Sequence, residues 1–383
     1  MNPKERSQTI IIAAGGTSGH IYPAFAIAAG IQKVLPAVRF IFCGVPGGLE
    51  QIMVESEGYA FHPIPAQNMP NRRNRRFFSW AWNNLRGMLK GRALLKAEAP
   101  QLVIGTGGFV SAPLIAAARW TRVPYFLHEQ NAVPGRANRL FARRARAVFI
   151  SYESSRPYFP AGGHIVFSGN PVRPLFFELD RTIAREALGV ADDIFLVMVM
   201  GGSLGSRTIN TAFAGMDEGG GWSALLDKYP QLRLVVSTGV QSSVDYTEKI
   251  AALPGVLSAE PFLHDAPYWI AACDLFVGRA GAMTCAEIAS QGKASVLIPF
   301  PHAVDDHQTE NARAMKEAGA SIVFSDGDFN SLQLLEILGH LIARPGLLAA
   351  MSESARRWAT PDAASTIAEA VAAALENHET VKA

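Results

Sequence analysis

The sequence contains little cysteine and no long apolar run. Its three cysteines, Cys43, Cys273 and Cys285, are an odd number, lie far apart and form no CxxC pair or metal-like spacing with histidine. This usage argues against a disulfide-stabilised secreted domain and favours the reducing cytoplasm. No stretch approaches the roughly 18 consecutive apolar residues of a membrane-spanning helix, so any membrane contact is expected to be peripheral. The apolar run at residues 10–14 is also too short for a signal peptide.

The net charge is also small, +2 over 383 residues, but it is unevenly distributed. Residues 1–170 contain 20 Lys and Arg against 7 Asp and Glu, whereas residues 171–383 contain 15 against 26. The two parts therefore carry +13 and −11. Such a split indicates that one part faces an anionic partner, and the pairing of two oppositely charged domains is the alternative.

What the chain has in quantity is apolar side chains. They make up 49% of the residues against 18% charged, which excludes a disordered chain and predicts substantial cores. Because one domain is ordinarily about 100 to 200 residues long, two domains are expected.

An internal repeat defines those domains. Residues 9–14 predict a buried strand that leads through a glycine turn into a helix, and residues 194–206 repeat this strand and turn, with Gly201 lying 186 positions after Gly15. Strands alternating with helices predict parallel sheets whose ligands bind at the carboxyl ends of the strands. Two prolines in GNPVRPLF, residues 169–176, mark the junction.

The second glycine turn has the features of a phosphate site. Gly201, Gly202, Ser203, Gly205 and Ser206 follow a strand and open a helix, where backbone N–H groups and the helix dipole favour an anion. A tight connection is the structural alternative, but two turns at matched positions favour ligand binding. Neither glycine turn fits a nicotinamide dinucleotide site, because neither matches GxGxxG and neither following strand ends in Asp or Glu.

The densest group of polar residues spans 278–312. Glu287 lies where a strand turns into a helix and can accept hydrogen bonds from two ribose hydroxyls, with an ordinary first-turn glutamate as the alternative. In the following loop Asp306, His307, Gln308 and Asn311 offer donors and acceptors to a sugar.

Six motifs occur in order along nearly the whole chain: GGTSGHIYPA, GTGGFVSAP, HEQNAVPGRAN, GNPVR, GGSLGS, and RAGAMTCAEI followed by HQTENA. In this order they resemble the motifs of glycosyltransferase family 28, and within it those of the MurG type. The resemblance implies an α/β fold of the GT-B class, two Rossmann-like domains with parallel sheets facing across a cleft. It implies an acceptor- and membrane-binding domain at residues 1–170, a UDP-sugar-binding domain at 171–357, and a helix at 358–383 that packs back on the first domain.

The same resemblance implies roles for individual residues. Ser203 and Arg173 would meet the diphosphate of the donor, the backbone of Leu263 would read uracil, and Glu287 would bind ribose. The two residues that would hold the GlcNAc are Gln308 and Asn131. The other substrate-binding positions are Thr17, Ser18 and Gly19 in the first domain and Ala282, Met283, Thr284, Cys285 and Ala286 in the second.

Three positions depart from the family pattern. Ser18 replaces a usual glycine, Leu204 a usual glutamine and Ala280 a usual serine. The class is unaffected, but any contact made by a side-chain amide at position 204 is lost or supplied elsewhere.

The implied reaction moves GlcNAc from UDP-GlcNAc to the C4 hydroxyl of MurNAc in lipid I, undecaprenyl-pyrophosphoryl-MurNAc-pentapeptide, with inversion, and makes lipid II for peptidoglycan. Backbone N–H groups at residues 202–206, with Arg173, are expected to stabilise the departing UDP. This scheme requires no metal or other cofactor, and the sequence has no compact DxD or histidine cluster.

His20 is the leading candidate for the base that deprotonates the acceptor, because the ordinary pKa of histidine lies near neutrality. His128, Glu129 and Asp306 compete for this role, and a histidine that only caps or packs is the structural alternative. Two other functions stay open. One is a UDP-sugar glycosyltransferase acting on diacylglycerol, against which HEQN and the motif order count. The other is a UDP-GlcNAc 2-epimerase or a non-catalytic sugar-nucleotide binding protein.

Residues 71–97 join a basic run to an amphipathic pattern. The run contains Arg72, Arg73, Arg75 and Arg76, and the apolar positions are Phe78, Ala81, Trp82, Leu85, Met88 and Leu89, with Phe77 and Trp80 adding rings. This composition suits anionic lipid at least as well as RNA, and the lipid-linked acceptor favours the cytoplasmic face of the membrane and no nucleic acid. Most of the apolar residues are expected to pack inward, so the membrane prediction rests on the arginines and the exposed aromatics.

Overall fold

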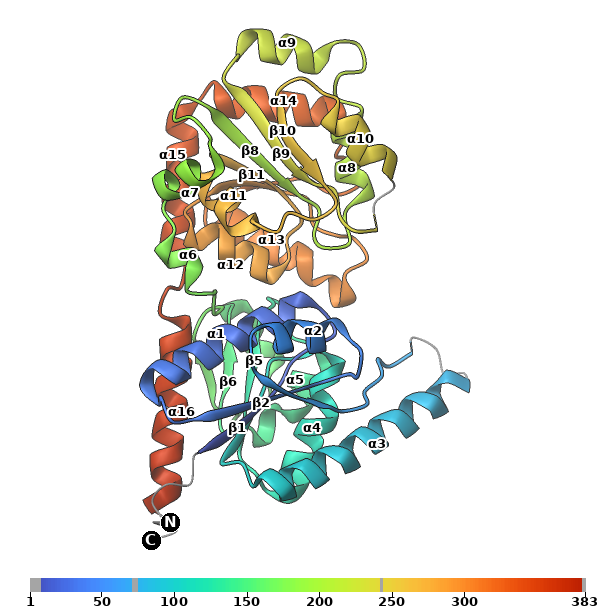
Figure 1. The fold of residues 1–383 in the computed structure, drawn as a ribbon, viewed down its shortest axis with the longest axis vertical. Helices are drawn as coiled ribbons and strands as arrows, with labels where there is room; N and C mark the ends of the chain where they lie inside the picture. The colour runs from blue at the N-terminus through green and yellow to red at the C-terminus, as the bar shows by residue number, and fades with distance from the viewer. Residues whose placement is uncertain (1–7, 71–74, 242–243, 381–383) are drawn as a thin grey trace. The chain divides into compact units, whose positions relative to one another are not determined.

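A computed structural model describes residues 8–70, 75–241 and 244–380; at residues 18, 75, 76, 244, 245 and 377–380 it describes the backbone alone. The chain forms two compact units, one of Met1–Arg173 with Thr360–Ala383 and one of Pro174–Ala359 (Figure 1). It passes from the first unit to the second inside the proline-containing segment 169–176.

The first unit is built on a seven-stranded parallel sheet in the order β3-β2-β1-β4-β5-β6-β7. Its strands are β1 (Thr9–Ala13), β2 (Arg39–Gly44), β3 (Ala60–Pro63), β4 (Leu102–Gly105), β5 (Tyr125–Glu129), β6 (Val148–Ile150) and β7 (Ile165–Phe167). Its helices are α1 (Ser18–Val34), α2 (Leu49–Ser56), α3 (Arg75–Glu98), α4 (Gly108–Thr121), α5 (Arg136–Phe141), the 3₁₀ turns η2 (Ala142–Arg144) and η3 (Glu153–Tyr158), and α16 (Ala363–Thr380).

The second unit is built on a six-stranded parallel sheet in the order β10-β9-β8-β11-β12-β13. Its strands are β8 (Phe195–Met200), β9 (Leu232–Ser237), β10 (Val256–Glu260), β11 (Leu275–Gly278), β12 (Ala294–Leu297) and β13 (Ser321–Val323). Its helices are α6 (Leu175–Glu178), α7 (Arg181–Leu188), α8 (Arg207–Ala214), α9 (Gly221–Lys228), α10 (Val244–Ala251), α11 (Ala266–Ala272), α12 (Ala282–Ser290), η4 (Val304–Asp306), α13 (His307–Glu317), α14 (Ser331–Ile342) and α15 (Pro345–Trp358).

The two sheets confirm the internal repeat. Taken in chain order, the six strands of the second sheet follow the same spatial order as the first six of the first sheet, so β8 occupies the place of β1 and β11 the place of β4. Strand β1 ends one residue earlier than predicted and β8 begins one residue later. In each sheet the strand order reverses between these two central strands, which is where α/β folds place their ligands.

Alternation along β1 shows how the first sheet separates two cores. Ile10 and Ile12 pack into one apolar cluster, while Ile11 and Ala13 pack into another on the opposite face. Helix α16 supplies Ile367, Ala368, Val371 and Leu375 to the first of these clusters. A Cβ added to Gly30 of α1 would lie 3.0 Å from the backbone oxygen of Ala364, so the glycine permits α1 and α16 to approach closely. The expected carboxyl-terminal helix from residue 358 is thus α16, which begins at Ala363.

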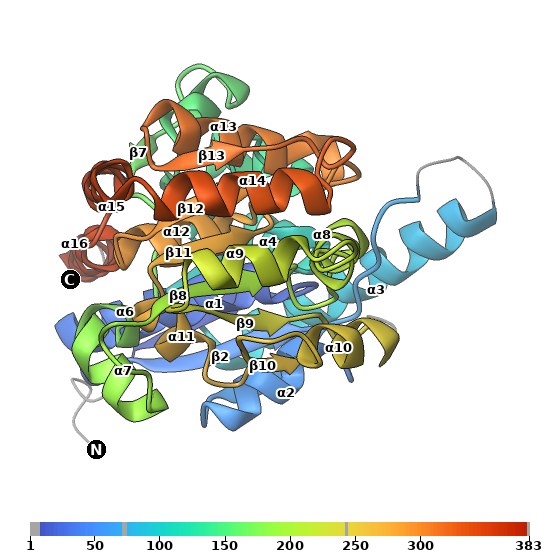
Figure 2. The same cartoon turned by 90° about the horizontal axis from the view of Figure 1, so that it is seen from above.

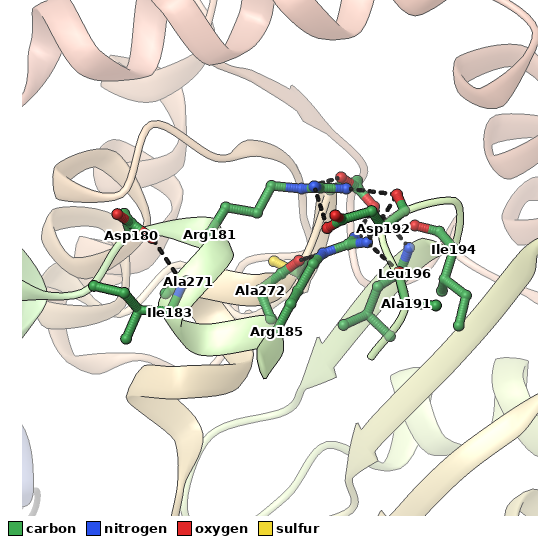
Figure 3. A network of polar contacts seen from close by, with 12 residues as sticks. Asp180, Arg181, Ile183, Arg185, Ala191, Asp192, Ile194, Leu196, Ala271 and Ala272 are labelled. Carbon is green, nitrogen blue, oxygen red and sulfur yellow. Dashed lines mark hydrogen bonds and ion pairs between the residues drawn. The ribbon is translucent and has the colours of Figure 1, made fainter. Parts of the chain in front are cut away.

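A buried cation ties the start of the second unit to its sheet (Figure 3). Arg185 of α7, 1% exposed, donates to Asp274 Oδ2 at 2.7 Å and to the carbonyl oxygens of Ala191, Asp192, Ile194 and Ala272. The same Asp274 oxygen accepts from the backbone N–H of Leu196 in β8. Because guanidinium and carboxylate are both satisfied, the pair holds α7, β8 and the α11–β11 turn in one arrangement.

Helix α3 corrects the expectation of inward packing. Phe78, Trp82, Leu85 and Leu89 are 78%, 61%, 43% and 47% exposed, and Ala81 is exposed as well; Met88 alone of the six packs against the core. The inward face instead carries Gly87, Gly91, Leu94 and Leu95, and a Cβ on Gly91 would lie 3.3 Å from Ala117 of α4. Gly87 and Gly91, followed by Leu94 and Leu95, thus take the inward side, while four large apolar side chains nearer the start of the helix are exposed. Figure 2 shows the amino-terminal half of α3 projecting from the rest of its unit.

Within the described ranges, no single helix is both long and apolar enough to cross a membrane. By length and composition alone, one pair bent by 94° meets that requirement, Ser331–Ile342 with Pro345–Glu376. Its residues Leu334, Leu338, Leu341, Leu348 and Met351 belong to the core of the second unit.

Candidate active site

The first glycine turn wraps around a buried carboxylate. Glu50, 3% exposed, accepts from the backbone N–H of Val45 at 2.9 Å and lies 3.5 Å from that of Gly16. A Cβ on Gly15, Gly44 or Gly48 would collide with the Glu50 side chain, so three glycines make room for one glutamate. Sequence reasoning missed Glu50, although the cluster GVPGGLE signals a side chain enclosed by glycines.

The residues after this turn lie at the start of α1. Thr17 is exposed at the N-cap position, Ser18 begins the helix with a side chain that is not described, and Gly19 is half-buried. His20, expected at the end of the turn, is therefore in the first turn of α1, and it is half-buried. Its Nδ1 lies 3.1 Å from the Thr106 carbonyl oxygen and 3.0 Å from Gln130 Oε1.

The competing bases in the first unit are enclosed. His128 is fully buried in β5, and desolvation lowers its pKa to about 4. Glu129, 2% exposed, accepts from the backbone N–H groups of Asn131 and Gly135 and from the Asn138 amide. The Glu129 carboxylate thereby holds the loop after β5. Of His20, His128 and Glu129, His20 is therefore the most accessible to solvent.

Asn131 and Arg173 are two other predicted site residues of the first unit. Asn131 is half-buried beside Glu129, with its Nδ2 3.4 Å from Glu129 Oε1. Arg173 places its guanidinium 4.3 Å from the ring centre of Tyr22 in α1, in a cation–π contact.

In the second unit the predicted phosphate turn connects β8 to α8 as expected. Gly202 and Gly205 have φ near +90°, a region that disfavours residues with a side chain, and a Cβ on Gly205 would collide with the Thr238 carbonyl. The Ser206 hydroxyl caps the helix by accepting from the Ile209 N–H at 3.3 Å. Ser203 is exposed on this loop, and its carbonyl accepts from the Val240 N–H at 3.0 Å. Leu204, at the family's glutamine position, is 57% exposed.

Helix α12 carries the predicted ribose ligand. Glu287 is 8% exposed and is the sixth residue of the helix, so the alternative of a first-turn glutamate is wrong. Among the neighbouring predicted positions, Ala282, Met283 and Ala286 are buried and Thr284 is half-buried. Cys285 is fully buried.

The polar residues after β12 do not form one loop. His307, Gln308 and Asn311 belong to α13, and Asp306 is the residue before it. Gln308 Oε1 accepts from the Phe300 N–H at 2.9 Å, while the buried Asn311 amide donates to the Ala280 carbonyl at 3.2 Å. Leu263 lies between β10 and α11 and is 5% exposed.

Comparison with known proteins decides the family. A model of the glycosyltransferase family 28 N-terminal domain matches residues 10–150, and one of the glycosyltransferase family 28 C-terminal domain matches residues 196–371. The chain belongs to glycosyltransferase family 28. The two matches cover one unit each in large part, with the second extending into α16.

Relatives within family 28 match along nearly the whole chain. The UDP-N-acetylglucosamine--N-acetylmuramyl-(pentapeptide) pyrophosphoryl-undecaprenol N-acetylglucosamine transferase of Salinibacter ruber is 36% identical over 98% of this chain and 99% of its own. The protein of the same name from Symbiobacterium thermophilum is 37% identical over 94% and 95%. The crystal structure of Acinetobacter baumannii MurG superimposes with a TM-score of 0.72 at 26% identity, covering 94% of this chain and 98% of that one.

One hydrogen-bond network in this family 28 chain was not predicted from the sequence. Arg279, 8% exposed after β11, donates to Asp326 at 2.5 Å and to the carbonyls of Ile298 and Pro299, and Thr208 of α8 donates to the same aspartate at 2.9 Å. The network links the loops after β11, β12 and β13 to the first turn of α8. Arg279 and Asp326 each follow the end of a strand, and a charged residue at such a position could have been recognised in the sequence.

Among the residues whose positions are described, no three His, Cys, Asp or Glu side chains form a group able to hold a metal ion.

Proposed function

We propose that this chain transfers GlcNAc from UDP-GlcNAc to the C4 hydroxyl of MurNAc in lipid I and so makes lipid II. The observation that carries the proposal is the full-length similarity to transferases of that name, which spans both units. The chain is a UDP-GlcNAc-dependent glycosyltransferase of peptidoglycan synthesis.

The second unit is assigned the donor. The α8 start, with Ser203 on the preceding loop, offers N–H groups and a hydroxyl to the diphosphate. Glu287 is assigned the ribose, the Leu263 backbone the uracil, and Gln308 the GlcNAc. Because Gln308 Oε1 already accepts from Phe300, its Nε2 is the group that we assign to the sugar.

The first unit is assigned the acceptor and the base. His20 would take the proton of the C4 hydroxyl as that oxygen attacks the anomeric carbon and the bond to UDP breaks. The negative charge that grows on the β-phosphate would be met by the fixed N–H donors of the α8 loop, which stabilise the transition state more than the ground state. Thr17, Ser18 and Gly19 are proposed as substrate-binding residues and Asn131 as a ligand of the GlcNAc, and Arg173 is retained as a diphosphate ligand on family resemblance.

Helix α3 is assigned to the membrane that contains the lipid-linked acceptor. The exposed line of Phe78, Trp82, Leu85 and Leu89 is flanked by the exposed cations Arg86 and Lys90. An apolar line beside cations fits the interface of an anionic bilayer. The expected arginine cluster lies partly outside the described residues, namely Arg72 and Arg73, and the side chains of Arg75 and Arg76 are not described. From the exposed apolar line and its neighbouring cations, we propose that the protein binds peripherally to the cytoplasmic face of the membrane.

The decisive experiment supplies purified protein with UDP-GlcNAc in the presence and absence of lipid I. UDP release should require lipid I and should equal the lipid II formed. Conversion of UDP-GlcNAc without an acceptor would instead identify an epimerase, and UDP release that depends on diacylglycerol would identify a glycolipid transferase.

A further inference from the structure

Three polar side chains form a chain of contacts at the carboxyl ends of β4 and β5. Gln130, 1% exposed, lies between His20 of α1 and His128 of β5. Its Oε1 is 3.0 Å from His20 Nδ1, and its Nε2 is 2.9 Å from His128 Nδ1 and 2.7 Å from the Thr106 carbonyl oxygen.

The Thr106 carbonyl determines which way the Gln130 amide points. A carbonyl oxygen can only accept, so the atom of Gln130 at 2.7 Å from it must be the NH₂ group. The opposite orientation would set two oxygen acceptors against each other inside the protein. Gln130 Oε1 therefore faces His20.

The orientation of Gln130 in turn determines where His20 carries its proton. Both groups near His20 Nδ1, the Thr106 carbonyl and Gln130 Oε1, are acceptors, so the Nδ1 position must carry hydrogen. In the neutral ring the lone pair then lies on Nε2. We propose that Gln130 is a positioning residue that holds His20 in the Nδ1–H tautomer and so makes Nε2 the atom that receives the acceptor's proton. The functional half of this inference rests on the proposed base role of His20.

His128 completes the arrangement from the other side. Gln130 Nε2 has two hydrogens, one for Thr106 and one for His128 Nδ1, which must therefore be an acceptor. The proton of His128 is then on Nε2, which lies 3.3 Å from the Gly169 carbonyl. Ser151 Oγ, 3.4 Å from the same nitrogen, gives its hydrogen to the Glu129 carbonyl and so faces His128 as an acceptor. Burial keeps His128 neutral by lowering its pKa, which preserves the acceptor that Gln130 needs.

Backbone packing fixes the plane of the His20 ring. A Cβ on Gly108 would lie 3.1 Å from His20 Cδ2, and one on Gly107 would lie 3.4 Å from its Cε1 and Nδ1. The two glycines let the chain after β4 lie against the ring, while the Thr106 hydroxyl donates to the His20 carbonyl at 2.8 Å. The ring is thus held in place by packing, and its tautomer is selected by Gln130 together with the Thr106 carbonyl.

Nuclear magnetic resonance of the full-length protein with ¹⁵N-labelled histidine tests the tautomer without reference to activity. The His20 signals are assigned by their loss in His20→Asn. When the His20 ring is neutral, we expect the ¹⁵N chemical shift of a protonated nitrogen at Nδ1 and that of an unprotonated nitrogen at Nε2. A proton on Nε2 in the wild type would overturn the inference.

Variants at position 130 test whether Gln130 is what holds His20 in the Nδ1–H tautomer. Gln130→Met, which removes the amide at similar volume, should give mixed His20 tautomers and lower kcat by about tenfold or more, with the KM for UDP-GlcNAc little changed. Gln130→Glu keeps an acceptor toward His20 and, with its second oxygen protonated to donate to the Thr106 carbonyl, should retain the Nδ1–H form. The matched control is Gln101→Met, because the Gln101 amide accepts from the Thr9 N–H at the opposite end of the sheet. An unchanged His20 tautomer in folded Gln130→Met would refute the proposal, whereas full turnover in His20→Ala would refute only the base role.

Discussion

At the residue scale, the surroundings of His20 distinguish it from the other titratable groups of the first unit. His128 and Glu129 lie one residue apart on the same strand end, yet one is fully buried and the other accepts from three loop groups. A catalytic base has to reach solvent or substrate, and the half-buried His20 meets that requirement better than either.

Removal of the His20 imidazole should therefore affect turnover more than binding. His20→Ala is expected to lower kcat by about 10²- to 10⁴-fold while the affinity for UDP-GlcNAc stays close to that of the wild type. Steady-state kinetics with lipid I and calorimetric titration with UDP-GlcNAc measure the two quantities. His164→Ala, which removes an exposed histidine of the same unit, is the control and should leave kcat unchanged. A near-normal kcat in His20→Ala would remove the residue from the base role.

His128 should make stability depend on pH. Its pKa is about 4 in the folded protein and about 6.5 in the unfolded chain, so between these values the unfolded state binds the extra proton. The stabilisation is complete above about pH 6.5 and is lost as pH falls toward 4, by roughly 3 kcal/mol in total. Urea unfolding at pH 7 and pH 5 measures the loss. His128→Gln, which cannot titrate, should show a smaller decrease; an equal decrease in both proteins would contradict this account.

At the scale of single elements, the segment that leads out of the first unit depends on a glycine. Gly169 has φ +80°, its carbonyl faces His128, and an added Cβ would overlap the side chain of Thr360 just before α16. The close approach of residues 169 and 360 brings the two ends of the first unit's chain together.

Gly169→Ala should destabilise the protein by two effects, an unfavourable backbone angle and the overlap with Thr360. Gly162→Ala isolates the first effect, because Gly162 has φ +83° and nothing lies within 4 Å of its added Cβ. We expect about 1 kcal/mol for Gly162→Ala and about 1–3 kcal/mol more for Gly169→Ala. Thr360→Gly in the Gly169→Ala background should recover part of the difference. Equal urea midpoints for the two alanine variants would show that the overlap is relieved without cost.

Helix α3 allows a similarly matched test of membrane binding. Trp82→Ser with Leu89→Ser should weaken sedimentation with phosphatidylglycerol vesicles by roughly ten- to a hundredfold, since each large apolar side chain contributes up to about 1.5–3 kcal/mol when buried. Arg72, Arg73, Arg75 and Arg76 changed together to Glu should also reduce binding, and more so at low salt. Leu332→Ser removes a side chain that is 61% exposed on α14 of the other unit and serves as the control. Vesicle binding that survives both sets of changes would exclude α3 as the docking element.

At the scale of the whole molecule, each unit has its own sheet and its own apolar clusters. The Arg185–Asp274 pair lies wholly inside the second unit, and Arg185 is 1% exposed (Figure 3). Among the described residues, loss of Arg185 would leave Asp274 with Arg181 as its one remaining ion-pair partner, at 3.2 Å, and would remove a buried donor from four backbone carbonyls.

Arg185→Leu should therefore destabilise the second unit by about 3–5 kcal/mol. Hydrogen exchange should accelerate in β8 and β11 and change little in β1 and β4. Arg313→Leu is the matched control, because Arg313 is 58% exposed in its ion pairs with Glu310 and Glu317 and should contribute less than about 1 kcal/mol. Equal acceleration in both sheets would mean that the two units unfold together.

The sequence was sufficient for the α/β class, the repeated strand–turn–helix pattern and the position of the glycine turn between β8 and α8. These features depend on local chemistry: runs of apolar residues form buried strands, and glycines mark turns with positive φ. The α8 loop was expected on the same grounds, whereas the ribose role of Glu287 rests on family resemblance and stays a prediction.

What the tertiary structure alone decided are the facts that depend on residues far apart in the chain. The outward face of α3 could not be read from its periodicity, because large apolar residues line one side, and glycines that fit against α4, together with two leucines, line the other. The contact of His20 with Gln130 joins positions 110 residues apart, and Glu50 is enclosed by the nearby Gly44 and Gly48 together with Gly15, which lies 35 positions earlier. Periodicity shows that a helix has two faces, but only packing against its neighbours determines which of the two faces is buried.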